Sequence, residues 1–139
     1  GLLLVWRRLR ICENLRERGR KLKKKTFYSL YQKNEVTGAV KHDGFQFEKN
    51  GMKFYVYQNR EGTVYIIDPP TGLSLTSEPF SVEDAPSCVS EYRIEQMEER
   101  RKSEEYQIKV KMFKALKKAA KVKEECEILL KGIKDNGKN

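Results

Sequence analysis

The chain has 139 residues, of which 38% are hydrophobic and 35% are charged, and its net charge is +9. This length suits one domain, or one compact domain with a helical extension, and the apolar fraction allows only a thin core. The N-terminal apolar run from Leu2 to Trp6 is cut short by Arg7 and is too short to span a bilayer, so we expect no integral membrane association.

The cysteine and histidine content argues against disulfides and metal sites. The three cysteines, Cys12, Cys88 and Cys126, lie far apart, and their odd number is typical of reduced thiols. There is one histidine, His42, and no Cys-x-x-Cys pair, so a zinc site of ordinary spacing is not expected. We therefore expect a cytoplasmic protein without a metal or another cofactor.

Residues 1–21 form a basic segment with a charge of +5, which leaves +4 for the rest of the chain. Glu17 to Lys21 contains only residues that purine codons can encode, as a translated ribosome-binding site would. Leu22 can be the decoded form of an alternative start codon. One interpretation is that residues 1–21 are upstream read-through. The other is a basic amphipathic helix that docks on the body of the protein.

Residues 26–76 have the pattern of antiparallel strands. Phe27 to Gln32 predicts a first strand, and Asn50-Gly51 is a strong hairpin signal because both turn residues need positive φ. A two-residue turn there pairs Lys49 with Met52, Glu48 with Lys53, Phe47 with Phe54 and Phe45 with Val56. The three phenylalanines and Val56 then share one face of the sheet.

A second turn at residues 59–62 leads into a strand over residues 63–67, which Pro69 ends because proline cannot donate to a ladder. Residues 73–76 predict a short edge strand. Together these segments predict an antiparallel meander of three to five strands, with one face covered by a helix. The expected fold class is α+β, divided into residues 1–21, 22–103 and 104–139.

The covering helix is expected from about residue 82, with Ser81 as its N-cap. Its apolar positions, at 3-4-3 spacing, are Val82, Ala85, Val89 and Tyr92. Residues 98–105 contain no apolar side chain. They form either a solvated bridge within one long helix or a break, with Ser103 capping a new helix.

The last helix, expected to reach about residue 133, has the most regular pattern in the chain. Apolar and small residues recur at 4-3-4-3-4-3-4 spacing, as in a coiled coil. We call this set the seam: Ile108, Met112, Ala115, Ala119, Val122, Cys126, Leu129 and Ile133. On a helical wheel, five lysines gather away from the seam. We call them the lysine arc: Lys111, Lys114, Lys117, Lys118 and Lys121.

The lysine arc predicts contacts with nucleic-acid phosphates, which give salt-dependent affinity without sequence specificity. The alternative is a solvated helix face, because lysine stems cover apolar surface while their ammonium groups stay in water. A helix lying on an anionic membrane is less favoured, since two alanines and a cysteine in the seam give little insertion.

The outer face of the sheet is a second candidate surface, formed by Lys53, Tyr55 and Tyr57 with Tyr65 nearby. Aromatic side chains beside lysine can stack nucleic-acid bases. The alternative is that these tyrosines pack under a terminal helix with their hydroxyl groups in water.

The seam has three possible occupants. It could form a homodimeric coiled coil, fill a groove on a partner protein, or pack on the chain's own N-terminal helix.

Residues with catalytic potential lack partners at useful spacing. His42 and Asp43 precede a hairpin, with no serine or cysteine placed by the sequence to use them, and a histidine in a turn is usually exposed. Cys88 has no basic neighbour at helical spacing that would activate its thiol. Asp68-Pro69 is not followed by the Asp/Glu-x-Lys pattern of restriction-type nucleases, and no Gly-Lys-Ser/Thr phosphate loop is present.

We therefore expect a non-catalytic binding protein that contacts nucleic-acid backbone through the lysine arc. The alternative is a protein–protein interaction or inhibitor module that uses the seam or the tyrosine face, and an enzyme is third. A short sheet followed by charged helices resembles the small accessory proteins of phages and other bacterial mobile elements. No specific motif carries this resemblance, and no functional residue follows from it.

Overall fold

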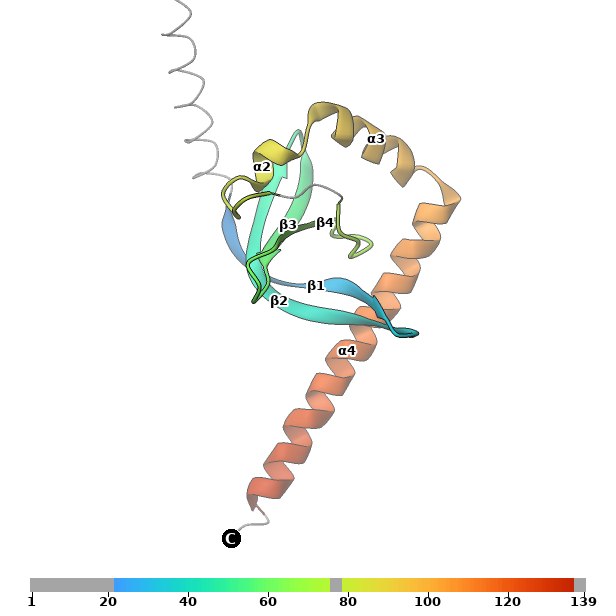
Figure 1. Ribbon diagram of the computed structural model, residues 1–139. Helices are drawn as coiled ribbons and strands as arrows, with labels where there is room; N and C mark the ends of the chain where they lie inside the picture. Colours follow the sequence, from blue (N-terminus) through green and yellow to red (C-terminus); the bar gives the residue numbers. More distant parts are fainter. Residues whose placement is uncertain (1–21, 76–78, 137–139) are drawn as a thin grey trace, which may run out of the picture.

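Alternating strands joined by tight turns build a four-stranded antiparallel sheet in the order β1-β2-β3-β4. The computed structural model describes residues 22–75 and 79–136, so the two interpretations of residues 1–21 lie outside it. The strands are β1 Lys23–Lys33, β2 Val36–Lys49, β3 Met52–Gln58 and β4 Val64–Ile67. The helices that follow are α2 Ala85–Cys88, α3 Glu91–Arg101 and α4 Glu104–Asn136 (Figure 1). The predicted α+β class is confirmed.

The β2–β3 hairpin has the predicted register. Asn50 and Gly51 have φ values of 50° and 77°, in the left-handed region that a type I′ turn requires. Phe47 pairs with Phe54, and Phe45 pairs with Val56. The sequence therefore sets which side chains of these two strands share a face.

The β1–β2 hairpin is longer than the sequence predicts, because residues 36–44 also belong to a strand. Its ladder runs from Lys23 opposite Gln46 to Lys33 opposite Val36. The turn residues Asn34 and Glu35 have φ values of 53° and 65°. Glycine usually occupies such positions, and glutamate seldom does. Because Glu35 stands where a glycine would be expected, the sequence does not indicate this turn.

Gly44 lets three strands approach one another closely. A Cβ atom at Gly44 would clash with the carbonyl oxygen of Val56 and would lie 2.9 Å from the ring of Phe27 and 3.1 Å from Cβ of Tyr57. Glycine inside a strand often marks such an approach of neighbouring groups. The ring of Phe27 therefore lies against the backbone of β2.

The segment after β4 connects both edges of the sheet. Ile67 forms an isolated β-bridge with Ser74. Over residues 73–75, which the structure describes, this bridge stands in place of the predicted edge strand. The N–H of Leu30 in β1 donates to the carbonyl of Gly72 at 2.8 Å. The sheet is accordingly curled, with β1 and the segment after β4 in contact (Figure 1).

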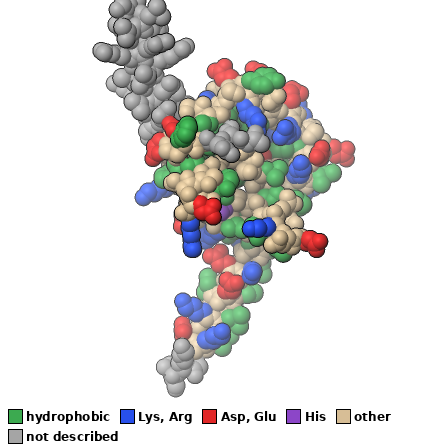
Figure 2. Space-filling model, in the orientation of Figure 1, with side chains coloured by type: hydrophobic (Ala, Val, Ile, Leu, Met, Phe, Trp, Pro, Cys, Tyr) green, Lys and Arg blue, Asp and Glu red, His purple; other side chains and the backbone are tan. Residues whose placement is uncertain are grey.

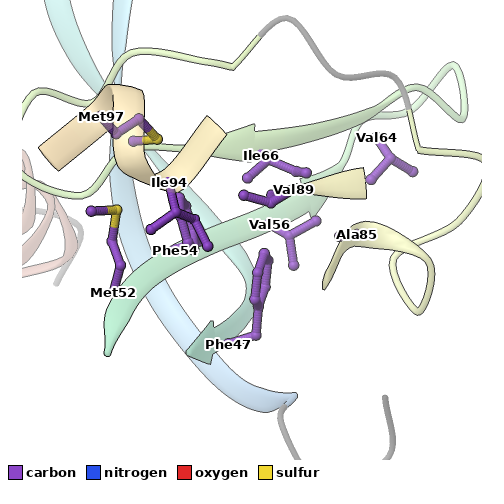
Figure 3. Close-up of a cluster of buried hydrophobic side chains, with 10 residues drawn as sticks. All are labelled: Phe47, Met52, Phe54, Val56, Val64, Ile66, Ala85, Val89, Ile94 and Met97. Carbon is purple, nitrogen blue, oxygen red and sulfur yellow. The ribbon is translucent and has the colours of Figure 1, made fainter. Parts of the chain in front are cut away.

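The hydrophobic core lies between the phenylalanine face of the sheet and helices α2 and α3 (Figure 3). Its buried members are Phe47, Met52, Phe54, Val56, Val64, Ile66, Ala85, Val89, Ile94 and Met97. The prediction that this face is covered by the segment after residue 82 is confirmed.

The covering segment is not one helix, so that part of the prediction is wrong. Helix α2 ends at Cys88, and Val89 has extended backbone. Ser90 then caps α3, its side chain accepting a hydrogen bond from the N–H of Arg93. The break turns Tyr92 outward, where it is 69% exposed, and Ile94 and Met97 take the core positions instead.

Residues 98–105 contain the break that was one of the two alternatives. Helix α3 ends at Arg101, and the Ser103 hydroxyl accepts from the N–H of Tyr106 at 3.2 Å. Helix α4 then crosses the sheet and extends beyond it (Figure 1). Phe113 of α4 is buried, and its ring lies where a Cβ atom of residue 72 would be.

Gly44→Ala should lower the free energy of unfolding by about 2 kcal/mol or more, because the added methyl group overpacks the strand crossing. Gly38→Ala is the matched control in the same strand, since no atom lies within 4 Å of the place that its added methyl group would take. Its effect should be within about 0.5 kcal/mol. Urea denaturation measures both, and equal effects of the two substitutions would contradict the close approach at Gly44.

Candidate nucleic-acid interface

Helix α4 packs on the sheet through one side, which we call the docking side. Its members recur at helical spacing and are Tyr106, Val110, Phe113, Lys117, Ala120 and Glu124. The Glu124 carboxylate accepts from Nζ of Lys41 at 3.1 Å and from the Tyr28 hydroxyl at 3.5 Å. The hydrogen bond and the charge of Glu124 raise the pKa of Lys41. These contacts set the rotation of α4 about its own axis.

Lys117 of the lysine arc belongs to the docking side, and the other four lysines lie between the docking side and the seam, not opposite the seam as expected. Lys111, Lys114, Lys118 and Lys121 are exposed, and Lys117 is half-buried. None of the five forms an ion pair with a carboxylate of the described residues. The charges of the arc are therefore not neutralised by a carboxylate of the described residues.

Two lysines of the arc lie over aromatic rings. Nζ of Lys117 is 5.0 Å from the ring centre of Phe113, and Nζ of Lys121 is 6.0 Å from that of Tyr28. Burial lowers the pKa of Lys117, and the charges of Lys121 and Lys114 lower it further. Repulsion of this kind within a lysine cluster is relieved when an anion binds.

A cleft of about 410 Å³ lies between β1 and α4, and the arc forms part of its wall. Phe27, Tyr28, Tyr55, Phe113, Lys117 and Lys121 are among its lining residues. Glu124 and Lys41, which pair with each other, also line it. The structure thus brings Tyr55 of the tyrosine face together with Lys117 and Lys121 of the lysine arc.

The remaining members of the predicted tyrosine face do not line this cleft. Lys53 is exposed. Tyr57 stacks on His42 with 3.7 Å between ring centres and on Tyr65 with 5.3 Å. Burial raises the pKa of Tyr57. Tyr57 packs on other aromatic rings of the sheet face and does not line the cleft beside α4. The alternative that the tyrosines pack under an N-terminal helix lies outside the described residues.

The expectation that His42 is an exposed turn residue is wrong. It lies in β2, it is half-buried, and its Nε2 is 2.7 Å from the hydroxyl oxygen of Ser29. The sequence could not place Ser29 beside it, because the long β1–β2 ladder was not predicted. Ser29 is only 5% exposed and lines neither the cleft nor the two cavities described next.

Asp68 is a buried carboxylate for which sequence reasoning considered only the end of a strand and a nuclease pattern that the chain lacks. It accepts hydrogen bonds from the Thr71 hydroxyl at 2.7 Å, from the Tyr106 hydroxyl at 2.8 Å and from Arg101 at 2.8 Å. Burial and the hydrogen bond to Asp68 raise the pKa of Tyr106. A cavity of about 570 Å³ opens beside this cluster, lined also by Arg100.

The seam faces away from the sheet and is exposed along its length. Ile108, Val122, Leu129 and Ile133 are between 58% and 68% exposed. Hydrophobic side chains are visible on the part of α4 that extends beyond the sheet (Figure 2). A third cavity, of about 590 Å³, borders the seam at Ala119 and reaches Val36 of β2. Within the described residues, the seam is therefore not packed against the protein itself.

Residues 22–75 and 79–136 match neither of two structural patterns, a cluster of metal-ligating side chains and a membrane-spanning helix. No group of three or more His, Cys, Asp or Glu side chains in these ranges is arranged to hold a metal ion. No helix in the same ranges is long and apolar enough to cross a membrane.

Comparison of the chain with protein-family models, with curated proteins and with solved structures gives no match. The function is therefore inferred from the geometry of α4 and the cleft.

Acidification should destabilise the protein through His42. Burial lowers the pKa of this group below its ordinary value of 6.5. The unfolded chain then binds the proton more tightly, so the free energy of unfolding falls as the pH drops below 6.5. Since His42 is the single histidine, His42→Gln should remove most of the change between pH 7.5 and pH 5.5. An unchanged pH dependence of urea denaturation in the variant would contradict this.

Asp68→Asn should lower the free energy of unfolding by about 3 kcal/mol, because it leaves the charge of Arg101 without a partner in a partly buried place. Tyr106→Phe removes one hydrogen bond from the same carboxylate and should cost about 1–2 kcal/mol. Urea denaturation of both variants tests whether Asp68→Asn lowers the free energy of unfolding more than Tyr106→Phe does. A larger loss for Tyr106→Phe would show that Asp68 is not the centre of the cluster.

Proposed function

We propose that the protein binds nucleic acid, preferentially single-stranded, through the lysine arc and the cleft between β1 and α4. The observation that carries this proposal is the convergence of Tyr28 and Tyr55 with Lys117 and Lys121 around one cleft. Ammonium groups contact phosphates, and an aromatic ring beside them stacks a base without reading its identity. A tyrosine or a lysine alone at this place has an ordinary structural explanation. The combination of two tyrosines and two lysines around one cleft favours a binding site.

The exposed lysines of the arc extend this site along α4. Lys111, Lys114 and Lys118 lie on successive turns of α4, which packs on the sheet through its docking side. Lysines one turn apart are about 5 Å apart along the axis, which suits a series of backbone phosphates. No base-specific contacts are part of the proposal, because the arc offers ammonium groups and no planar donor pair.

A second candidate function is binding of another protein through the seam. The observation that favours it is the exposure of the seam on the side of α4 that faces away from the sheet. An apolar stripe of this spacing is the surface that a helical partner recognises.

The test of nucleic-acid binding is fluorescence anisotropy of the full chain with single-stranded DNA, RNA and duplex DNA over a salt series. Replacing Lys111, Lys114, Lys118 and Lys121 by glutamine should reduce the log–log salt slope by about 2–3, as loss of three to four phosphate contacts predicts. The control replaces the exposed residues Lys23, Lys24, Lys33 and Arg60 by glutamine, which removes the same charge from places outside α4. If both variants lose the same amount of salt slope, the binding depends only on the net charge of the protein. That result would contradict an interface on α4.

The aromatic wall of the cleft has a separate signature. Tyr28→Leu should weaken single-stranded binding by about five- to tenfold or more, because one stacked base is worth roughly 1–3 kcal/mol. The salt slope should stay as in the wild type, since no charge is removed. Unchanged affinity would exclude Tyr28 as a stacking residue.

A further inference from the structure

The seam runs along the whole of α4, on the side opposite the docking side. Ile108 and Tyr106 are two residues apart and so about 200° apart on the helical wheel. The seam keeps its 4-3 spacing from Ile108 to Ile133, which is about 37 Å along the axis. Stripes of this kind are buried by a second helix in coiled coils.

We infer that the seam binds the seam of a second copy of this chain in antiparallel orientation, forming a homodimer. This names the partner for the second candidate function, on which it rests. The homodimer can be tested separately from nucleic-acid binding, because the test measures the molecular mass of the protein in the absence of any nucleic acid.

The sizes of the seam residues match in one antiparallel register. An antiparallel pair centred between Ala120 and Lys121 opposes large residues at both ends and smaller ones in the middle. The layers are Ile108 with Ile133, Met112 with Leu129, Ala115 with Cys126 and Ala119 with Val122 of the second copy. A parallel pair would instead oppose each alanine to itself and leave the middle of the seam poorly filled.

The residues that flank the seam also distinguish the two orientations. In the antiparallel register, Lys118 lies beside Glu125 of the second copy, and symmetry repeats this attractive pair. On the other flank, lysine stems lie over leucines: Lys109 beside Leu130, and Lys123 beside Leu116. In a parallel pair, Lys118 would lie beside Lys123 of the second copy, which is repulsive. Charge complementarity therefore favours the antiparallel pair.

The docking sides point outward in such a dimer, so the two sheets lie on opposite sides of the helix pair. In an antiparallel pair, the flank of α4 that carries Lys111 and Lys118 lies next to the equivalent flank of the second copy. Both lysine arcs then lie on one surface of the dimer. A longer strand of nucleic acid could contact both.

The first test is sedimentation equilibrium of the full chain over a concentration series into the sub-millimolar range. The wild type should move from 16.3 kDa toward twice that mass. Val122→Asp should abolish the shift. Ile128→Asp is the matched control, because Ile128 is 64% exposed against 58% for Val122 but lies outside the seam. Circular dichroism checks that both variants are folded. A monomer at all concentrations, or equal loss in both variants, would overturn the homodimer.

Charge variants test the orientation in the same measurement. Lys118→Glu should weaken the dimer on the order of tenfold or more, because it places like charges together twice. Adding Glu125→Lys to it should restore the affinity. Strengthening by Lys118→Glu alone is the result for a parallel dimer and would overturn the antiparallel register.

Disulfide trapping gives an independent reading of the register. In a chain with Cys12→Ser and Cys88→Ser, Ala115→Cys should form a disulfide between copies with Cys126 under mild oxidation. Without Ala115→Cys, the two Cys126 residues would be about 16 Å apart along the axis, too far for a disulfide. A Cys126–Cys126 link between copies would overturn the proposed arrangement.

Discussion

The buried carboxylate of Asp68 links the junction of α3 and α4 to the sheet. It follows β4 directly, and it accepts hydrogen bonds from its own turn through Thr71, from the end of α3 through Arg101 and from the start of α4 through Tyr106. Three separate elements are thereby fixed to one point. A buried charge without these partners would be costly, so the arrangement is sharply specified. The position and direction of α4 follow from it.

Once α4 is anchored, its three sides acquire separate roles. The docking side packs on β1, β2 and the turn at Gly72, where the absence of a Cβ atom admits Phe113. The lysine arc borders the cleft that contains Tyr28 and Tyr55. The seam points away from the sheet. The same rotation of one helix therefore supports both proposals: a basic and aromatic site on one flank, and a self-complementary apolar stripe on the outer side.

The sequence determined the features that depend on neighbouring residues. The Asn50-Gly51 turn fixed the β2–β3 register, because only one pairing satisfies a two-residue turn. The spacing of the α4 residues predicted a helix with an apolar seam, and a new helix capped by Ser103 was one of the two alternatives for residues 98–105. Turn chemistry, helical periodicity and capping can be read from the sequence because they act within a few residues along the chain.

The tertiary structure decided what depends on residues far apart in the chain. The Asn34-Glu35 turn has no glycine to announce it, so the long β1–β2 ladder and the contact of His42 with Ser29 were not foreseen. The burial of Asp68 depends on Arg101 and Tyr106, more than thirty residues away. The most regular apolar pattern in α4 proved to be the exposed one, and a less regular set docks on the sheet. Periodicity shows that a helix has an apolar side. Which side faces the body is decided by the packing of the whole chain, which minimises buried charge and fills space.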